Sequence, residues 1–199
     1  NVPSMKVLLF ISSHRHLEEI LLSSSFFNRT KHLKLVADVM LFCDNDSISM
    51  EQLDKLARYE TNVNIIKGEQ VFDSSMPTGI SGNGIHLGLG QCFDKFLEYD
   101  YVINMVPDCY ITTDEHIWGL LERELDTDNV FIVDHHPHHN ESTATQFACD
   151  FFAFKPKMTP NIFQEIDMNN LVPPENFIYN KIQEHKLQYT TIERIGSLQ

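Results

Sequence analysis

Short apolar runs alternate with segments of helical spacing through the first 134 residues of this 199-residue chain. A short apolar run between turn signals is typical of a buried strand, and apolar residues three and four positions apart are typical of a helix. Strands that alternate with helices form a mostly parallel sheet with helices on both faces. We therefore predict a single α/β domain, Rossmann-like, whose central sheet has about six strands. The expected strands are residues 6–11, 35–43, 63–66, 101–105, 130–133 and 147–154, and the expected helices are residues 14–23, 49–59, 85–97, 114–125 and 174–185.

Three of the expected helices carry a recognisable start signal. Ser49 with Gln52 three residues later is a capping-box pattern. Asp114 is an acidic N-cap for the helix that follows it, and Pro174 is suited to the first turn of the last helix. We expect these helices to begin at those residues.

The composition is ordinary for a globular protein, with 42% hydrophobic and 22% charged residues. The net charge of -13 argues against broad binding to nucleic acid or to anionic membranes. No apolar run approaches the roughly 18 residues of a membrane span, and we see no signal peptide before the first strand. We therefore expect a cytoplasmic protein. The four cysteines lie in or beside apolar runs and are expected to be free thiols in a reducing compartment: Cys43, Cys92, Cys109 and Cys149.

Two acidic residues follow predicted strands, at the edge of the sheet where α/β proteins bind their ligands. Asp108 follows the strand at residues 101–105, and Asp44 opens the string Asp44-Asn-Asp46 after the second strand. Asp108 is a suitable ligand for a hard divalent cation that carries phosphates, whereas Asp44 either contacts a ligand or forms an Asx turn. The second Asp-x-Asp string, at residues 126–128, lies between a helix end and a strand start, and we expect it to be a solvated turn.

The order of these parts resembles the GT-A class of nucleotide-sugar glycosyltransferases over residues 6–155. In that class a first strand opens beside the nucleotide, and a second strand ends in an acidic residue near the base. A glycine-containing loop and a helix then precede a strand that ends in Asp-x-Asp and an apolar pair. The resemblance extends to domains of large algal-virus proteins that build capsid glycans. The corresponding segments are Phe10-Ile-Ser-Ser-His-Arg15, Phe42-Cys-Asp-Asn-Asp46, Gly79-Ile-Ser-Gly-Asn-Gly84 and Val106-Pro-Asp108-Cys-Tyr-Ile111.

The resemblance implies a GT-A-like fold and the transfer of a sugar from a UDP-linked donor to a glycan or other hydroxyl acceptor. It implies Asp108 as the direct ligand of Mn²⁺ or Mg²⁺, which would stabilise the leaving diphosphate. Val106 replaces the first Asp of the pair, so the metal needs a further ligand. Residues 5–112 would then form the nucleotide-binding part, and residues 113–199 the acceptor side.

On the nucleotide side, Arg15 and Lys67 are candidate phosphate partners or, alternatively, ordinary surface charges. Asn83 belongs to a glycine-containing loop, residues 68–84, which is either a flexible lid over the donor or a plain long loop. The candidate residues beside the nucleotide are Ser12, Ser13, Arg15, Asp44, Lys67 and Asn83.

Four of the ten histidines lie within five positions, residues 135–139, after the fifth predicted strand. Three interpretations stay open: His135 and His136 supply the missing metal ligand, the segment lines the acceptor site, or it is a polar loop without a ligand. Together with Asp134, these histidines also resemble the Asp-His-His motif of DHH-type phosphoesterases. The segment Ser12-Ser-His-Arg15 does not match the motif that those enzymes carry after the first strand.

Two carboxylates are candidates for catalysis on the acceptor side. Asp150 is a charged residue within an apolar run, where a carboxylate needs partners. Glu175 lies at the start of the last helix, where it serves the reaction or only the helix dipole. Cys149 is not expected to be a nucleophile, because no activating residue adjoins it.

The sequence therefore predicts a metal-dependent UDP-sugar glycosyltransferase that uses a nucleotide-sugar donor and a glycan acceptor. Two alternatives come from other classes. One is a DHH-type metal-dependent phosphoesterase that uses Asp134, His135 and His136. The other is a catalytically inactive nucleotide-binding domain, which the replacement of the first Asp by Val106 allows.

Overall fold

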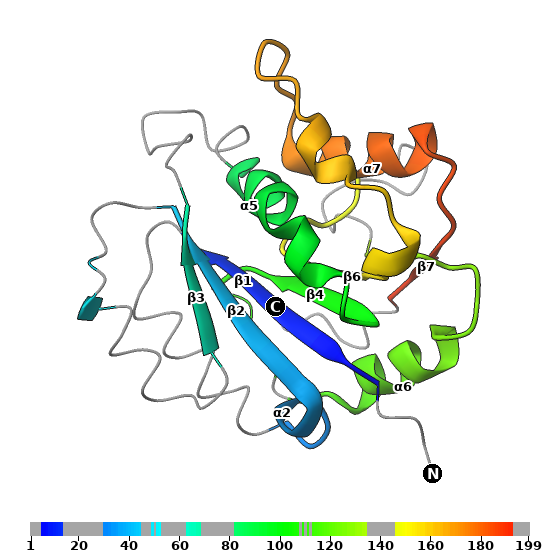
Figure 1. Ribbon diagram of the computed structural model, residues 1–199. Coiled ribbons are helices and arrows are strands. Elements are labelled where there is room, and N and C mark those ends of the chain that lie inside the picture. The colour runs from blue at the N-terminus through cyan, green and yellow to red at the C-terminus, as the bar shows by residue number, and fades with distance from the viewer. Residues whose placement is uncertain are drawn as a thin grey trace, which may run out of the picture.

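The computed structural model describes residues 5–13, 30–44, 49, 51–52, 63–68, 82–107, 109, 111, 113–134 and 146–192. They form a seven-stranded sheet flanked by helices (Figure 1). None of the described helices is both long and apolar enough to cross a membrane. The strands are β1 (Val7–Ser13), β2 (Ala37–Cys43), β3 (Val63–Lys67), β4 (Tyr101–Met105), β5 (Phe131–Val133), β6 (Phe151–Phe154) and β7 (Tyr189–Thr191). The α-helices are α2 (Leu33–Val36), α5 (Gly84–Cys92), α6 (Glu115–Glu124) and α7 (Pro174–Glu184), and the 3₁₀ helices are η1 (Phe93–Phe96), η3 (Pro156–Met158) and η4 (Ile162–Glu165).

The strand order is β3-β2-β1-β4-β6-β5-β7, and all neighbouring pairs are parallel except those made by β6. The predicted mostly parallel α/β sheet is therefore confirmed. The sheet has one strand more than expected, because β7 pairs with β5 at the far edge. β6 is also shorter than predicted: its ladder begins at Phe151, and residues 147–150 precede it.

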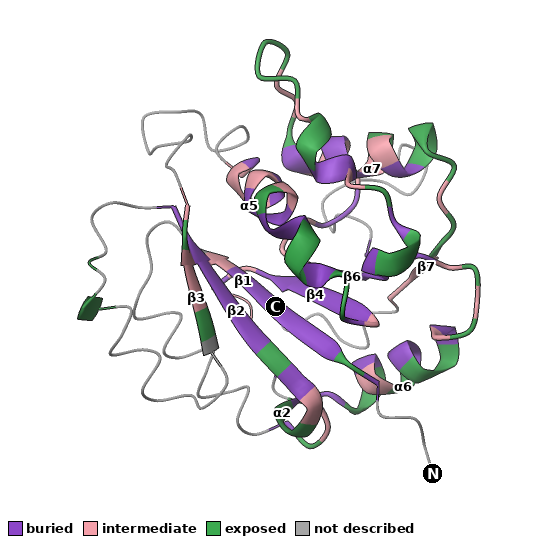
Figure 2. Ribbon diagram, viewed as in Figure 1, coloured by how far each residue is buried: buried purple, intermediate pink, exposed green. Residues whose placement is uncertain are grey.

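Side chains alternate along the strands, so each face of the sheet buries its own cluster. On one face, Leu120 and Leu121 of α6 pack with the odd-numbered residues of β1 and β4. On the other face, Leu89 of α5, Phe163 of η4 and Ile178 of α7 pack with the even-numbered residues. Figure 2 shows the central strands buried along most of their length, as expected for a sheet with both faces covered.

The second strand begins later than predicted, at Ala37, because of a contact with a residue far away in the sequence. Residues 35 and 36 belong to α2 instead of β2. The carboxylate of Asp114 accepts the backbone N–H groups of Lys31, His32 and Leu33 at 3.0, 2.8 and 2.7 Å. Asp114 stands at the N-cap of α6 as predicted, but its side chain does not cap that helix. It satisfies the free N–H groups at the start of α2 instead.

The remaining helix predictions hold in part. Ser49 and Gln52 exchange the two hydrogen bonds of a capping box, at 2.9 and 3.2 Å, and residues 53–59 lie outside the described part of the chain. The helix predicted at residues 85–97 is α5 followed by η1. The helix predicted at residues 174–185 is α7. The helix predicted at residues 14–23 and most of the loop at 68–84 also lie outside the described residues.

Candidate active site at the carboxyl edge of the sheet

The candidate site lies at the edge where the parallel strands end. β1 ends at Ser13, β2 is followed by Asp44, and β3 ends at Lys67. β6 runs in the opposite direction, so its first residue, Phe151, pairs with Met105 at the end of β4. The sheet therefore brings Ser12, Asp44, Lys67 and the chain that precedes β6 to the same edge.

We call residues 146–150, which precede β6, the crossing segment. Its last two residues are fastened to β4. The backbone N–H of Val106, just past β4, donates to the carbonyl of Asp150 across 3.1 Å. The side-chain amide of Asn104, inside β4, donates to the carbonyl of Cys149 across 3.0 Å. Asp150 is thereby held beside the end of the strand that leads to the predicted metal ligand.

The crossing segment is also fastened to β5 and α7. The N–H of Ala148 donates to the carbonyl of Asp134, the residue after β5, across 2.7 Å. The N–H of Phe147 donates to the carbonyl of Glu175 across 3.2 Å, and the thiol of Cys149 donates to Glu175 Oε1 across 3.4 Å. The crossing segment therefore contains Asp150 and is hydrogen-bonded to two further acidic residues from separate parts of the chain, Asp134 and Glu175.

The acidic neighbours of Cys149 affect the pKa of its thiol. Burial raises the pKa of its thiol, and the nearby charges of Glu175 and Asp150 raise it further. A thiol that stays protonated is a weak nucleophile. The structure therefore agrees with the prediction that Cys149 does not attack a substrate, and it makes this thiol a hydrogen-bond donor to Glu175 instead.

Asp44 is a buried carboxylate at the ligand edge. It is only 7% exposed, and its Oδ1 atom accepts no hydrogen bond from the described residues. Burial raises its pKa to about 6, and its own backbone N–H offsets only part of that effect. A buried carboxylate oxygen without a donor is costly and is often found where a ligand binds. This placement suits the predicted nucleotide contact.

Some of the other nucleotide-side candidates lie within the described residues, and others do not. Ser12 is half-buried near the end of β1, and Lys67 is exposed at the end of β3. Both stand at the ligand edge. Several predicted site residues lie outside the described residues, or have side chains that do: Ser13, Arg15, Asp108, His135 and His136.

Asn83 is placed differently from the prediction. Its side chain is 1% exposed, and its amide donates to the carbonyl of Val172 across 2.8 Å. Asn83 therefore fastens the start of α5 to the chain ahead of α7. We leave it out of the proposed nucleotide site, because a side chain buried in this contact is not presented to a ligand.

The predicted metal would need ligands at this edge of the sheet. Among the described residues, no three His, Cys, Asp or Glu side chains gather closely enough to hold an ion. Carboxylate oxygens are nevertheless the ligands that Mg²⁺ and Mn²⁺ prefer, and Asp134 and Asp150 bring such groups to this edge. The donor chemistry of the edge therefore fits a hard cation.

Two residues of this region carried only a weak signal in the sequence. Asn104 is a polar residue inside an otherwise apolar strand, and it is fully buried. His86 lies on α5 and is also fully buried, with its ring Nε2 3.0 Å from the carbonyl of Pro174. A polar residue in an apolar pattern was the available clue to both, but their partners could not be read from it.

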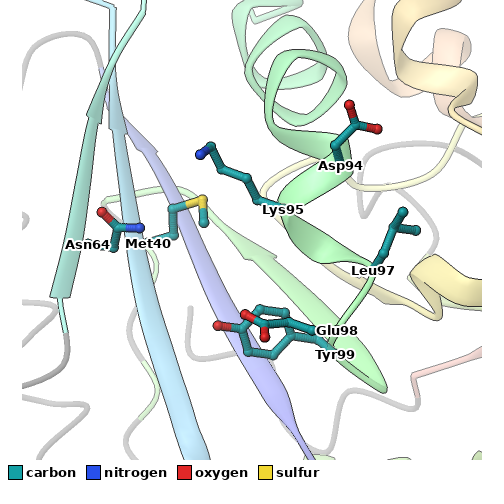
Figure 3. A pocket seen from close by; sticks show the side chains of 7 residues that line it. All are labelled: Met40, Asn64, Asp94, Lys95, Leu97, Glu98 and Tyr99. Carbon is teal, nitrogen blue, oxygen red and sulfur yellow. The ribbon is translucent and has the colours of Figure 1, made fainter.

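A pocket of about 630 Å³ lies elsewhere, against β2, β3 and η1. Figure 3 shows the amino group of Lys95 directed toward Met40 and Asn64 on the strands. No predicted site residue lines this pocket, and its charged residues are exposed. We therefore place the candidate site at the carboxyl edge instead. The residues that line the pocket are Met40, Asn64, Asp94, Lys95, Leu97, Glu98 and Tyr99.

The fold has close counterparts among solved structures, although no protein-family model and no curated protein matches the sequence. A mannosyltransferase from Pyrobaculum calidifontis, solved with GDP-Man and Mn²⁺, has a TM-score of 0.63 at 8% identity, over 98% of this chain and 56% of its own. The glycosyltransferase GlyE from Streptococcus pneumoniae has a TM-score of 0.55 at 14% identity, over 95% of this chain and 45% of its own.

The chain therefore has the GT-A-type fold of nucleotide-sugar glycosyltransferases. It spans about half the length of these two glycosyltransferase chains. A third similar structure is the 4-diphosphocytidyl-2C-methyl-D-erythritol synthase from Anaerococcus prevotii. Its TM-score is 0.61 at 8% identity, over 97% of this chain and 89% of its own. At these identities, the comparisons define the fold.

Proposed function

We propose that this chain is a glycosyltransferase domain that moves a sugar from a nucleotide sugar, UDP-linked, to a hydroxyl of a glycan acceptor. The observation that carries the proposal is the combination of a GT-A-type fold with acidic residues at its ligand edge. Residues 5–112 would bind the nucleotide and residues 113–199 would form the acceptor side, within one domain.

On the donor side, we assign the nucleotide to the ends of the first three strands. Asp44 would accept hydrogen bonds from the base or the ribose, and Ser12 and Ser13 would lie beside the same nucleotide. Arg15 and Lys67 would pair with the diphosphate, because a guanidinium and an ammonium group are the usual partners of phosphate oxygens.

The metal belongs beside the diphosphate. Asp108, two residues past Val106, would hold Mn²⁺ or Mg²⁺, and His135 or His136 would replace the ligand lost at Val106. When bound, the ion would stabilise the negative charge that develops on the departing diphosphate. Imidazole as an additional ligand favours Mn²⁺ over Mg²⁺.

On the acceptor side, Asp150 and Glu175 are the candidates for the catalytic carboxylate. The acceptor oxygen would bond to the anomeric carbon as the bond from that carbon to the diphosphate breaks. The nucleoside diphosphate would leave, and the hydroxyl proton would pass to the carboxylate. Asp150 belongs to the crossing segment and Glu175 is hydrogen-bonded to it, which supports a role for either carboxylate beside the acceptor.

A thermal-shift panel tests the donor side directly. UDP, GDP, CMP and ADP are added at saturating concentration with and without Mn²⁺. We expect one nucleotide with Mn²⁺ to raise the melting temperature by about 5 °C or more. The Asp108→Asn variant should lose the metal-dependent part of that shift, whereas Asp128→Asn, in an exposed turn, should keep it. The proposal fails if no nucleotide raises the melting temperature with any metal.

A second candidate is nucleotidyl transfer, which would form a nucleotide-linked product instead of consuming one. The similarity to the cytidyl-compound synthase favours it, because this chain covers 89% of that protein but about half of the glycosyltransferases. The two reactions differ in the product that leaves. Incubation with CTP and sugar phosphates would release pyrophosphate, whereas incubation with UDP-glucose or GDP-Man would release a nucleoside diphosphate. A nucleotide shift without either product would indicate an inactive nucleotide-binding domain.

A further inference from the structure

The start of α5 is packed closely against the chain that opens α7. Asn83 donates to the carbonyl of Val172 at 2.8 Å, and the ring of His86 donates from Nε2 to the carbonyl of Pro174 at 3.0 Å. A side chain at Gly82 would place its Cβ 2.9 Å from Cγ of Pro174, so only glycine fits there without a shift. Gly82 and His86 therefore meet Pro174 directly, and Asn83 holds Val172, two residues before it.

Pro174 immediately precedes Glu175, the acceptor-side carboxylate. Glu175 is held from the opposite side by the crossing segment, through Phe147 to its carbonyl and through Cys149 to its Oε1. The first turn of α7 is thus clamped between α5 and the crossing segment. A displacement of Pro174 would move Glu175 relative to Cys149 and Asp150.

His86 is a buried, neutral histidine with one ring nitrogen that receives no hydrogen bond from the described residues. Its ring is fully buried among aromatic side chains, 4.9 Å from Phe177 and 5.9 Å from Phe163 between ring centroids. Burial lowers its pKa to about 4, so the ring is neutral. Because a carbonyl only accepts, Nε2 carries the proton, and Nδ1 is then an acceptor that receives no hydrogen bond within the described structure.

Stability alone does not account for a histidine here. A phenylalanine would fill the same aromatic surroundings without burying an unsatisfied ring nitrogen, which costs free energy. The carbonyl of Pro174 does not require the hydrogen bond either, because the first carbonyl of an α-helix accepts the N–H four residues later. The hydrogen bond from His86 therefore serves to fix where α7 begins.

We propose that His86 is a positioning residue for the acceptor side of the site, which holds Glu175 in place through Pro174. This inference rests on the proposed glycosyl transfer for its catalytic consequence. The contact between Glu175 and Cys149 supplies a second consequence that does not depend on any activity, because burial and then the charge of Glu175 raise the pKa of the Cys149 thiol.

The test compares His86→Phe, which keeps the ring, with His86→Gln, whose side-chain amide can still donate to Pro174. His116→Phe, at an exposed histidine on α6, is the matched control. The first measurement is the rate at which iodoacetamide alkylates Cys149, followed by peptide mass spectrometry. We expect a severalfold faster reaction in His86→Phe, a rate near that of the wild type in His86→Gln, and no change in His116→Phe.

The second measurement is the release of nucleoside diphosphate from UDP-glucose or GDP-Man with Mn²⁺. We expect kcat to fall by about 10- to 100-fold in His86→Phe with KM for the donor unchanged, and to recover in His86→Gln. If the wild type binds no nucleotide and releases none, the proposed function fails, and the alkylation rates still decide the positioning role. An unchanged alkylation rate of Cys149 in folded His86→Phe, or an unchanged kcat in an active enzyme, overturns the inference.

Discussion

The carboxylate of Asp114 accepts the backbone N–H of Leu33 across 2.7 Å, although the two residues are 81 positions apart in the sequence. The same carboxylate accepts the N–H groups of Lys31 and His32. Burial alone would raise the pKa of Asp114, but the three backbone donors together with its own backbone N–H outweigh it, and the pKa is lowered. One side chain thus connects α6 to the start of α2 and keeps its charge at neutral pH.

We predict that Asp114→Ala lowers the free energy of unfolding by about 3 kcal/mol, because it leaves three backbone N–H groups without their acceptor. Urea unfolding at pH 7 measures this loss. The matched control is Glu115→Ala, the neighbouring carboxylate, which forms an exposed ion pair with Lys31. Exposed pairs contribute little, so the control should lose much less. Equal losses in the two variants would contradict the role of Asp114.

Asp44→Asn is predicted to stabilise the protein at pH 7.5 while it removes nucleotide binding. The folded pKa of Asp44 is raised from 3.8 to about 6, so the charged form is disfavoured in the folded state. Its contribution to stability therefore falls as pH rises from about 4 to 6 and stays low above that. Replacing it with a neutral amide should raise the free energy of unfolding by up to about 3 kcal/mol at pH 7.5 and by little at pH 4.

Unfolding curves at both pH values, and the nucleotide thermal shift, check this prediction. Asp128→Asn serves as the control, because Asp128 lies exposed in the turn at the opposite edge. A stabilised variant that kept the full nucleotide shift would remove Asp44 from the binding site.

His86 should produce the opposite dependence on pH. Burial lowers its pKa from 6.5 to about 4, so the unfolded chain binds a proton in this range that the folded chain does not. Its contribution to stability is therefore intact above pH 6.5 and is lost by roughly 3 kcal/mol as pH falls to 4. Urea unfolding of wild type and His86→Phe between pH 4 and pH 7 should show the free energy of unfolding of the wild type falling relative to that of the variant as pH falls.

Gly88 and Gly119 should respond in opposite ways to alanine. A Cβ at Gly88 would lie 2.8 Å from the ring of Phe42, which fills the space between β2 and α5. Overpacking there should lower the free energy of unfolding by about 1–3 kcal/mol, less the gain in helix propensity. A Cβ at Gly119 meets no atom within 4 Å, so Gly119→Ala should raise it by about 0.5–1 kcal/mol. Guanidinium unfolding of both variants checks the sign of each change.

The fold could be predicted wherever burial was visible along the chain. The five residues of β4 were predicted at their observed bounds, because a central strand covered on both faces is an almost continuous apolar run. β7 was missed because its three residues are half-buried or exposed, and only their pairing with β5 makes them a strand. Leu35 and Val36 were assigned to a strand because their local pattern is apolar, whereas Asp114 supplies the acceptor that lets a helix form there.

The candidate site, like the fold, could be predicted only where a local pattern in the sequence was visible. Asp44 and Glu175 became candidates because strand ends and helix starts are visible in the sequence, and Asp150 became one as a charged residue within an apolar run. The hydrogen bonds that hold this part of the structure together could not be predicted from the sequence. Asn104 reaches a carbonyl 45 positions away, and His86 reaches one 88 positions away. Nothing in a local pattern specifies such a partner.

The sequence by itself determined the α/β class, the edge at which the acidic residues gather and the free state of the described cysteines. Those properties follow from hydrophobic periodicity and from the residues that stand at strand and helix ends, which act over a few positions. Only the tertiary structure decided the reversed direction of β6, the clamp on Glu175 and the partner of Asp114. Each of these depends on hydrogen bonds between segments far apart in the chain, which form only once the two faces of the sheet have been covered.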